Sequence, residues 1–112
     1  MDVFDKYSGE RLGSVRDASA ADVHRAVTRA SVTAPAWGAV AAHKRSTILR
    51  RTAGLLESKR EALAELIARE SGKAWRYATA EVGRGVETFE FAAEEAKRLH
   101  GETVPLDASA AG

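Results

Sequence analysis

The sequence contains no cysteine among its 112 residues. Disulfides, thiolate metal sites and a cysteine nucleophile are therefore excluded within these residues. No apolar run approaches the roughly 20 residues of a membrane-spanning helix. The opening MDVFDKYSGE has neither the basic nor the apolar region of a secretory signal. These features predict a cytoplasmic protein that does not bind a membrane.

Neither sign of charge dominates, because 17 basic side chains are matched by 16 acidic ones and the net charge is +1. A protein with so little net charge has no general field that attracts nucleic acid. The segment HKRSTILRR does gather basic residues at Lys44, Arg45, Arg50 and Arg51. No aromatic side chain alternates with them as in a nucleic-acid groove. We interpret the cluster as a solvated helix face and expect no nucleic-acid partner.

The amino-terminal third has two local patterns. VFDKYSGERLGSV alternates apolar and polar residues around Ser8 and Gly9, which predicts a β-hairpin over 3–15. Ser19 and Asp22 then stand at capping-box spacing before an amphipathic run, which predicts a helix over about 20–31. We expect Pro35 to end this helix.

Three more helices are predicted downstream, at about 42–57, 59–71 and 74–100, from apolar residues that recur every three or four positions. A single helix over 42–71 would be unusually long. Ser58 and Glu61 repeat the capping-box spacing, so we place a break near Ser58. The start of a strand is expected at 103–106. The fold class is then α+β, mainly helical, with about four helices and an amino-terminal hairpin.

Two glycines, Gly83 and Gly85, lie inside the last predicted helix. Each costs the helix about 1 kcal/mol relative to alanine. They indicate a neighbouring backbone that passes close by, a tolerated bend, or simply a weak spot.

The pair Gly72 and Lys73 raises the question of a phosphate-binding loop. Such a loop needs a glycine five positions before the pair and a Ser or Thr directly after it. Here those positions hold Ile67 and Ala74. We therefore interpret Gly72 as the left-handed residue that ends a helix, with Lys73 near the negative end of the helix dipole.

Clusters of titratable residues predict no active site and no metal site. The segment FEFAAEEAKR contains Glu87, Glu90, Glu94 and Glu95. Paired carboxylates can perform acid–base chemistry, but Glu94 precedes Arg98 by four positions, which favours surface ion pairs. The histidines, at positions 24, 43 and 100, have no partner at metal-ligand spacing.

The order of these segments resembles the amino-terminal part of the aldehyde dehydrogenase superfamily. The resemblance covers nearly the whole chain and rests on DKYSGERLGSV, on ASAADVHRAVTRA, on Trp37 ahead of KRSTILRRTAGLLE, on LIARESGKAWRYATAEV and on AAEEAKRLHGETVPLD. It implies that 1–112 is the amino-terminal segment of an α/β enzyme with a Rossmann-like cofactor domain. Members oxidise aldehydes to carboxylic acids with NAD or NADP, through a thioester on a cysteine.

The resemblance also implies what this sequence does not carry. The family's nucleophile, its general-base glutamate, its oxyanion-hole asparagine and its nucleotide-binding strand, turn and helix lie further along than residue 112. No catalytic or cofactor-binding residue is therefore assigned, and the chain alone is expected to be inactive and to bind no nucleotide. The implied partner is the remainder of the dehydrogenase fold, which in full-length members is usually homo-oligomeric.

One residue is assigned to substrate binding by resemblance. EVGRGVETFEFAAEEAKRLHGE is similar to the branch that includes non-phosphorylating glyceraldehyde-3-phosphate and phosphonoacetaldehyde dehydrogenases. In that branch the arginine of a Glu-Val-x-Arg motif pairs with the substrate's anionic group, and that position here is Arg84. The alternative for Arg84 is an ordinary surface arginine. Glu81 falls where some members place an acidic ligand for a monovalent cation, but we assign no metal.

A second reading of the whole chain is a stand-alone helical module that binds a partner protein without catalysis. Under either reading the apolar helix faces exceed what one short chain can cover. We therefore expect an exposed apolar surface and a sticky or partly molten domain.

Overall fold

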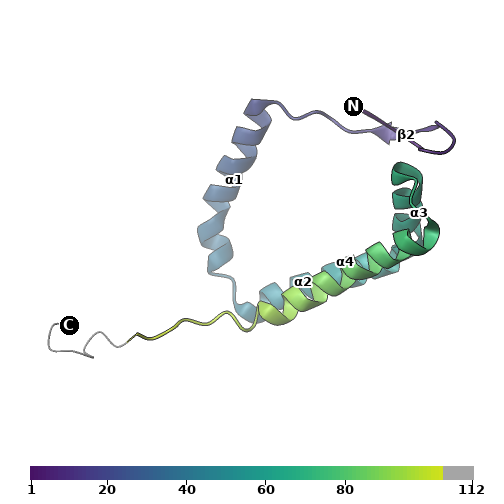
Figure 1. Cartoon of the computed structure of the whole chain (residues 1–112). Coiled ribbons are helices and arrows are strands. Elements are labelled where there is room, and N and C mark those ends of the chain that lie inside the picture. The colour runs from purple at the N-terminus through teal and green to yellow at the C-terminus, as the bar shows by residue number, and fades with distance from the viewer. Residues whose placement is uncertain (105–112) are drawn as a thin grey trace.

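The computed structural model describes residues 1–104. Its elements are, in chain order, β1 (Asp2–Phe4), β2 (Arg11–Ser14), α1 (Ala20–Gly38), α2 (Ala42–Ser58), α3 (Arg60–Ser71) and α4 (Trp75–Glu95) (Figure 1). Four helices and a small antiparallel sheet confirm the predicted fold class. The radius of gyration is 21.0 Å, whereas a compact domain of this length has about 13 Å. The chain is therefore open and extended.

The hairpin pairs β1 with β2 in antiparallel register, with Asp2 opposite Ser14 and Val3 opposite Gly13. The register shifts between Val3 and Phe4. Gly9 lies in the connecting turn with φ of 74°, a conformation that glycine adopts without strain. The turn predicted around Ser8 and Gly9 is thus confirmed.

Helix α1 begins as the sequence predicts and ends later. The Ser19 side chain accepts a hydrogen bond from the Asp22 amide, and the Asp22 carboxylate accepts one from the Ser19 amide. The capping box is therefore confirmed. The expected end near residue 31 is wrong, because the helix continues through Pro35 to Gly38. Proline removes one helical donor and its ring crowds the carbonyl four residues earlier, but the Pro35 carbonyl still accepts a hydrogen bond from the Ala39 amide at 3.1 Å.

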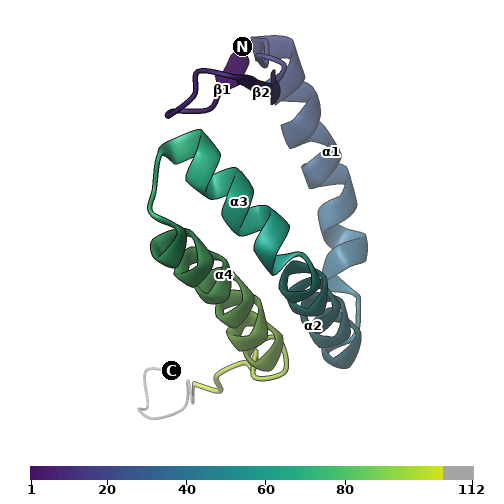
Figure 2. The same ribbon diagram turned by 90° about the vertical axis from the view of Figure 1, so that its right-hand side faces the viewer.

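None of the residues of α1 is buried. In Figure 1 this helix stands apart from α3 and α4, and Figure 2 shows it on one side of the other three helices. Helix α4, by contrast, packs against both α2 and α3. Helices α2, α3 and α4 therefore form a packed bundle, and α1 is separate from it.

Helices α2 and α3 are separated at Lys59, close to the predicted break. The second capping box does not form, because α3 begins after Lys59 without a side-chain cap. The Ser58 hydroxyl instead donates to the Leu55 carbonyl at 2.9 Å. Serine at the end of a helix can satisfy a local carbonyl in this way, and here that bond replaces the predicted cap.

The core lies between α3 and α4. Its buried residues are Ala64, Ala78 and Val82, with Leu63, Ile67 and Ala68 packed around them. Further along α4, Val86 and Ala93 are also buried. Most of these side chains are small, so the helix backbones approach closely and little apolar area is removed from water.

The carboxyl end of α4 differs from the prediction, because the helix ends at Glu95 rather than near residue 100. The amides of Lys97 and Arg98 donate to carbonyls three positions earlier, on Glu94 and Glu95. Such bonds tighten the last turn of a helix, and side-chain periodicity does not reveal the change. Residues 103 and 104 form no strand, and 105 and 106 lie outside the described residues.

No helix within residues 1–104 is both long and apolar enough to cross a membrane.

Candidate functional site

The site predicted by resemblance lies on α4, whose start is fixed by Gly72. This residue ends α3 in the left-handed conformation, with φ of 72°, and its amide donates to the Ala68 carbonyl. The predicted role of Gly72 is confirmed. A Cβ at this position would stand 3.4 Å from the Lys6 Cβ, which is an ordinary van der Waals contact, so the backbone angle and not the space favours glycine.

Gly83 marks a close approach inside α4. A Cβ there would lie 3.0 Å from the Arg60 Nη1 atom of α3, whereas a Cβ at Gly85 would meet nothing within 4 Å. The neighbour of Gly83 is therefore a side chain and not a backbone, which corrects one of the three interpretations. Arg60 also donates through Nε to a Glu57 carboxylate oxygen at 2.9 Å.

The outward face of α4 carries Arg84 between two aromatic side chains. Tyr77 and Phe91 lie seven positions before and after Arg84, which is two helical turns in each direction and the same side of the helix. They are 53% and 72% exposed. The sequence prediction missed both aromatics, although the seven-residue spacing was visible and would have identified this face.

Arg84 is exposed. Within residues 1–104, no ion pair joins its guanidinium to a carboxylate. Glu81, one turn earlier, is paired with Lys73 instead. The pKa of Glu81 is lowered mainly by its hydrogen bond and charge interaction with Lys73, and to a smaller extent by Arg84. Lys73 thus pairs with the carboxylate one turn before Arg84. Lys73, which was predicted near the negative end of the α3 dipole, also forms an ion pair with Glu81.

An open groove of about 740 Å³ lies between α2 and α4. Its lining residues are Arg50, Ala53, Gly54, Glu87, Glu90, Phe91 and Glu94. Small residues form part of its wall and carboxylates form much of the rest. The groove does not contain Arg84.

One glutamate of this groove, Glu94, forms surface ion pairs, as the sequence predicts, but not with Arg98. Glu94 pairs with Arg50 on α2 and with Lys97, and Arg98 pairs with Glu95. Hydrogen bonding and charge interaction with Lys97 lower the pKa of Glu94. A general acid needs a raised pKa, so the environment of Glu94 is that of a structural ion pair.

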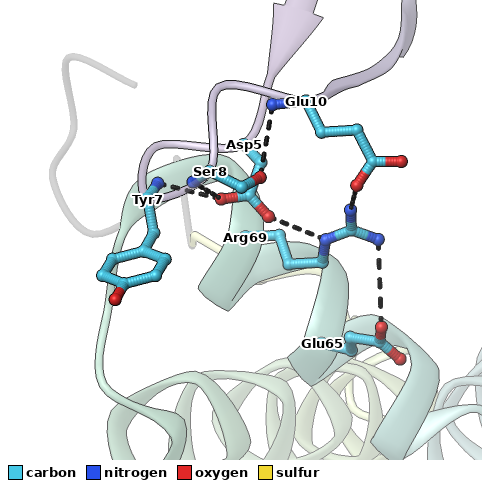
Figure 3. A network of polar contacts seen from close by, with 6 residues as sticks. All are labelled: Asp5, Tyr7, Ser8, Glu10, Glu65 and Arg69. Atoms are coloured by element: carbon cyan, nitrogen blue, oxygen red, sulfur yellow. Dashed lines mark hydrogen bonds and ion pairs between the residues drawn. The ribbon is translucent and has the colours of Figure 1, made fainter.

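A second polar network joins the hairpin to α3 (Figure 3). Arg69 donates through Nε to Asp5 at 2.8 Å and through Nη2 to Glu10 at 2.6 Å. The Arg69 carbonyl accepts the Lys6 amide at 2.9 Å. The pKa of Asp5 lies well below its usual range, chiefly because of the hydrogen bond from Arg69 and then those from the turn amides. This network attaches the hairpin to the end of α3.

Across the part of the chain that the structure describes, no three His, Cys, Asp or Glu side chains are placed to hold a metal ion.

The chain belongs to the aldehyde dehydrogenase family, whose sequence profile matches residues 1–111. It is 36% identical over 105 residues to the NADP-dependent succinate-semialdehyde dehydrogenase GabD of Escherichia coli. That match covers 94% of this chain and 22% of the relative. The chain therefore spans about a fifth of the length of the curated relatives that it matches.

Solved structures give the same assignment. Aldehyde dehydrogenase 21 of Physcomitrella patens, in complex with the reaction product succinate, matches with a TM-score of 0.92 and 37% identity over 99% of this chain and 23% of its own. An NADP-dependent glyceraldehyde-3-phosphate dehydrogenase from Bacillus halodurans, complexed with NADP, matches with a TM-score of 0.91 and 33% identity over 100% of this chain and 24% of its own. The predicted family is confirmed.

Proposed function

We propose that this chain is the amino-terminal segment of an NAD(P)-dependent dehydrogenase that oxidises an aldehyde with an anionic group to the carboxylic acid. The observation that carries the proposal is Arg84, an exposed guanidinium with no carboxylate partner in the described chain. The relatives support the substrate class. The name of one specifies succinate semialdehyde, another holds succinate, and a third is a glyceraldehyde-3-phosphate dehydrogenase. Each of these compounds carries a carboxylate or a phosphate.

The chemistry of Arg84 suits this role. A guanidinium is planar, stays charged at any physiological pH and binds a carboxylate or phosphate through two parallel hydrogen bonds. Because Lys73 holds Glu81, the carboxylate one turn before Arg84 is already paired. Within residues 1–104 the Arg84 guanidinium forms no ion pair, and this supports its binding of an external anion.

The chain by itself supplies no chemistry for the oxidation in this proposal. A thioester requires a cysteine, and the sequence has none. We therefore expect neither aldehyde oxidation nor NAD or NADP binding by the isolated chain. In the complete assembly, the remainder of the dehydrogenase fold provides the nucleophile and the cofactor site. We propose a cytoplasmic homo-oligomer for that assembly.

A chimera tests this function. The chain replaces the corresponding segment of the E. coli relative, and oxidation of succinate semialdehyde is compared with oxidation of an uncharged aldehyde of similar length. Loss of a hydrogen bond to a charged group costs about 1.5–3 kcal/mol, so Arg84→Ala should raise KM for the anionic aldehyde roughly 10- to 100-fold. KM for the uncharged aldehyde should stay within about twofold.

The matched control is Arg51→Ala, which removes an exposed arginine from α2. It should leave both substrates unaffected. Equal losses on both aldehydes in the Arg84 variant would make Arg84 a structural residue. A chimera without any activity would argue against the proposed function as a whole.

The separate position of α1 favours a second candidate, a stand-alone interaction module. None of its residues is buried, as expected of a helix that awaits a partner. Light scattering on the isolated chain distinguishes the two candidates. A discrete dimer supports the module, whereas heterogeneous association supports a segment of a larger enzyme.

A further inference from the structure

Arg84 has a carboxylate in its own helix that is placed to compete for it. Four ion pairs of the described chain join a carboxylate to the basic side chain three positions later, namely Asp22–Arg25, Glu57–Arg60, Glu94–Lys97 and Glu95–Arg98. Glu81 and Arg84 have the same order and the same spacing within α4. Side chains three positions apart are neighbours on a helix surface. The helix therefore places an internal anion beside the guanidinium that the proposed function assigns to substrate binding.

Glu81 nevertheless pairs with Lys73 and, within residues 1–104, not with Arg84. The pKa of Glu81 is lowered chiefly by the hydrogen bond and the charge of Lys73, and in smaller part by the charge of Arg84. Arg84 is thus close enough to attract this carboxylate without binding it. The two basic side chains compete for one glutamate, and Lys73 holds it.

The turn between α3 and α4 brings Lys73 to Glu81. Gly72 reverses the chain in the left-handed conformation, and Ala74, which follows Lys73, is extended with ψ of 141°. Lys73 therefore stands just outside the start of α4, from where its flexible four-carbon stem reaches back along the helix. The side chains of Lys73 and Glu81 are 38% and 41% exposed. Because ion pairs this exposed contribute little to folding, the pair can be removed without unfolding the chain.

We propose that Lys73 is a positioning residue for the substrate, because it holds the Glu81 carboxylate away from Arg84 and keeps the guanidinium open to the anionic group of an aldehyde. This inference rests on the proposed function. Lys73 acts through Glu81 and does not touch the substrate, since its ammonium is paired with that carboxylate. Without the charge of Lys73, Glu81 turns to Arg84 and competes with the substrate anion. An uncharged aldehyde does not take part in this competition.

Lys73→Met tests the proposal in the chimera described above, because methionine removes the ammonium and keeps an unbranched side chain. An exposed ion pair changes an equilibrium constant by roughly 1.5- to 5-fold. KM for succinate semialdehyde should therefore rise by about that factor, and KM for the uncharged aldehyde should not change. A purely structural role of Lys73 would affect both aldehydes alike.

A double variant shows whether Lys73 acts through Glu81. Lys73→Met combined with Glu81→Gln removes one charge of each sign, so the net charge is that of the unsubstituted chimera. KM for succinate semialdehyde should return to its original value, because no carboxylate remains at position 81 to compete for Arg84.

Lys6→Met is the matched control for a general loss of positive charge. The Lys6 Cβ lies 3.4 Å from the position that a Cβ would take at Gly72, so Lys6 stands beside the same turn as Lys73. Lys6 takes part in none of the ion pairs of residues 1–104. Its substitution should leave KM for both aldehydes unchanged.

The isolated 112-residue chain gives a second measurement that needs no activity. In Lys73→Met, formation of an ion pair between Glu81 and Arg84 should shift the Nε–H resonance of Arg84 and slow its exchange with water. Neither change should occur in the double variant, which lacks the carboxylate.

Four results would overturn the role of Lys73. One is an unchanged KM in Lys73→Met while Arg84→Ala raises KM for the anionic aldehyde, which would leave the proposed function standing. Another is failure of the double variant to restore KM, since Lys73 would then attract the substrate itself. The third is an equal rise of KM in Lys6→Met, and the fourth is an unchanged Arg84 resonance in the isolated Lys73→Met chain. If Arg84→Ala itself leaves KM unchanged, the proposed function fails and this inference fails with it.

Discussion

Helices α1 and α4 have similar lengths and both carry an apolar side, yet only one of them is packed. Helix α4, with 21 residues, buries Ala78, Val82, Val86 and Ala93, whereas α1, with 19 residues, buries none. The pattern of apolar residues therefore predicts that one side of a helix packs against another part of the protein. It does not say which part of the protein covers it.

The connections explain the difference. Gly72 turns the chain sharply between α3 and α4, so these helices become neighbours directly. Helix α1 is joined to the hairpin through an extended segment and to α2 through residues 39–41. Because neither neighbouring element packs along α1, its apolar residues stay exposed.

The largest expected effect is at the packed core. Ala78 is fully buried between α3 and α4, so Ala78→Leu should destabilise the bundle by about 1–3 kcal/mol through overpacking. Ala30→Leu makes the same change on the exposed helix α1 and should shift stability by less than about 0.5 kcal/mol. Urea denaturation followed by circular dichroism measures both. Similar losses in the two variants would show that α1 is packed in solution.

A smaller and local effect is expected at the start of α1. Ser19→Ala removes the hydroxyl that accepts the Asp22 amide, and loss of such a cap costs about 1 kcal/mol. Amide exchange should accelerate in α1 and stay unchanged in α3 and α4. Ser31→Ala, in the middle of α1, is the control. Faster exchange throughout the bundle would contradict the separation of α1 from it.

The two glycines of α4 should respond differently to alanine. Gly85→Ala adds a methyl group where nothing lies within 4 Å and should stabilise the isolated chain by about 0.5–1 kcal/mol. Gly83→Ala should gain less, because its Cβ would press on Arg60 Nη1 at 3.0 Å. Thermal melts rank the two variants. A larger gain from Gly83→Ala would show that the Arg60 side chain moves aside freely.

The mildest effect concerns pH and the hairpin. The folded pKa of Asp5 lies below its ordinary value because Arg69 and the turn amides bind the carboxylate. Stability from this group is therefore fully present above the unfolded pKa, about 3.9, and is lost as pH falls through the lower folded pKa. The amide resonance of Lys6, which donates to Arg69, should shift only below about pH 4.

Arg69→Gln removes the main cause of that lowered pKa, so the same change in the Lys6 resonance should occur at a higher pH. Glu65→Gln is the control, since the Glu65 carboxylate lies 4.0 Å from Arg69. Glu65→Gln should leave the pH of the Lys6 transition unchanged. An unchanged transition in the Arg69 variant would mean that hydrogen bonds from the turn amides alone lower the pKa of Asp5.

Much of the fold could be predicted because its signals are local. The Ser19 cap, the left-handed Gly72 and the break beside Ser58 each depend on a few adjacent residues. The misplaced ends depend on backbone hydrogen bonds, which the pattern of side chains does not report. Pro35 stays helical because its carbonyl remains bonded, and α4 ends early because the hydrogen bonds of its last turn change.

The candidate site was predicted less completely. Arg84 came from resemblance, whereas the flanking Tyr77 and Phe91 were visible only as a spacing of seven. The pairing of Lys73 with Glu81 was not predicted, because the chain reverses at Gly72 before the next helix brings the two side chains together. The Asp5 and Arg69 contact joins residues 64 positions apart, a separation that no local pattern reports.

That separation has a consequence for biosynthesis. The hairpin leaves the ribosome before its anchor, because Arg69 follows Asp5 by 64 residues. At about 5–20 residues per second, the delay is on the order of 3–13 s. A two-stranded hairpin alone is marginally stable in water, so this hairpin is secured only after Arg69 has been made. During that interval the outer edges of its two strands can pair with other chains.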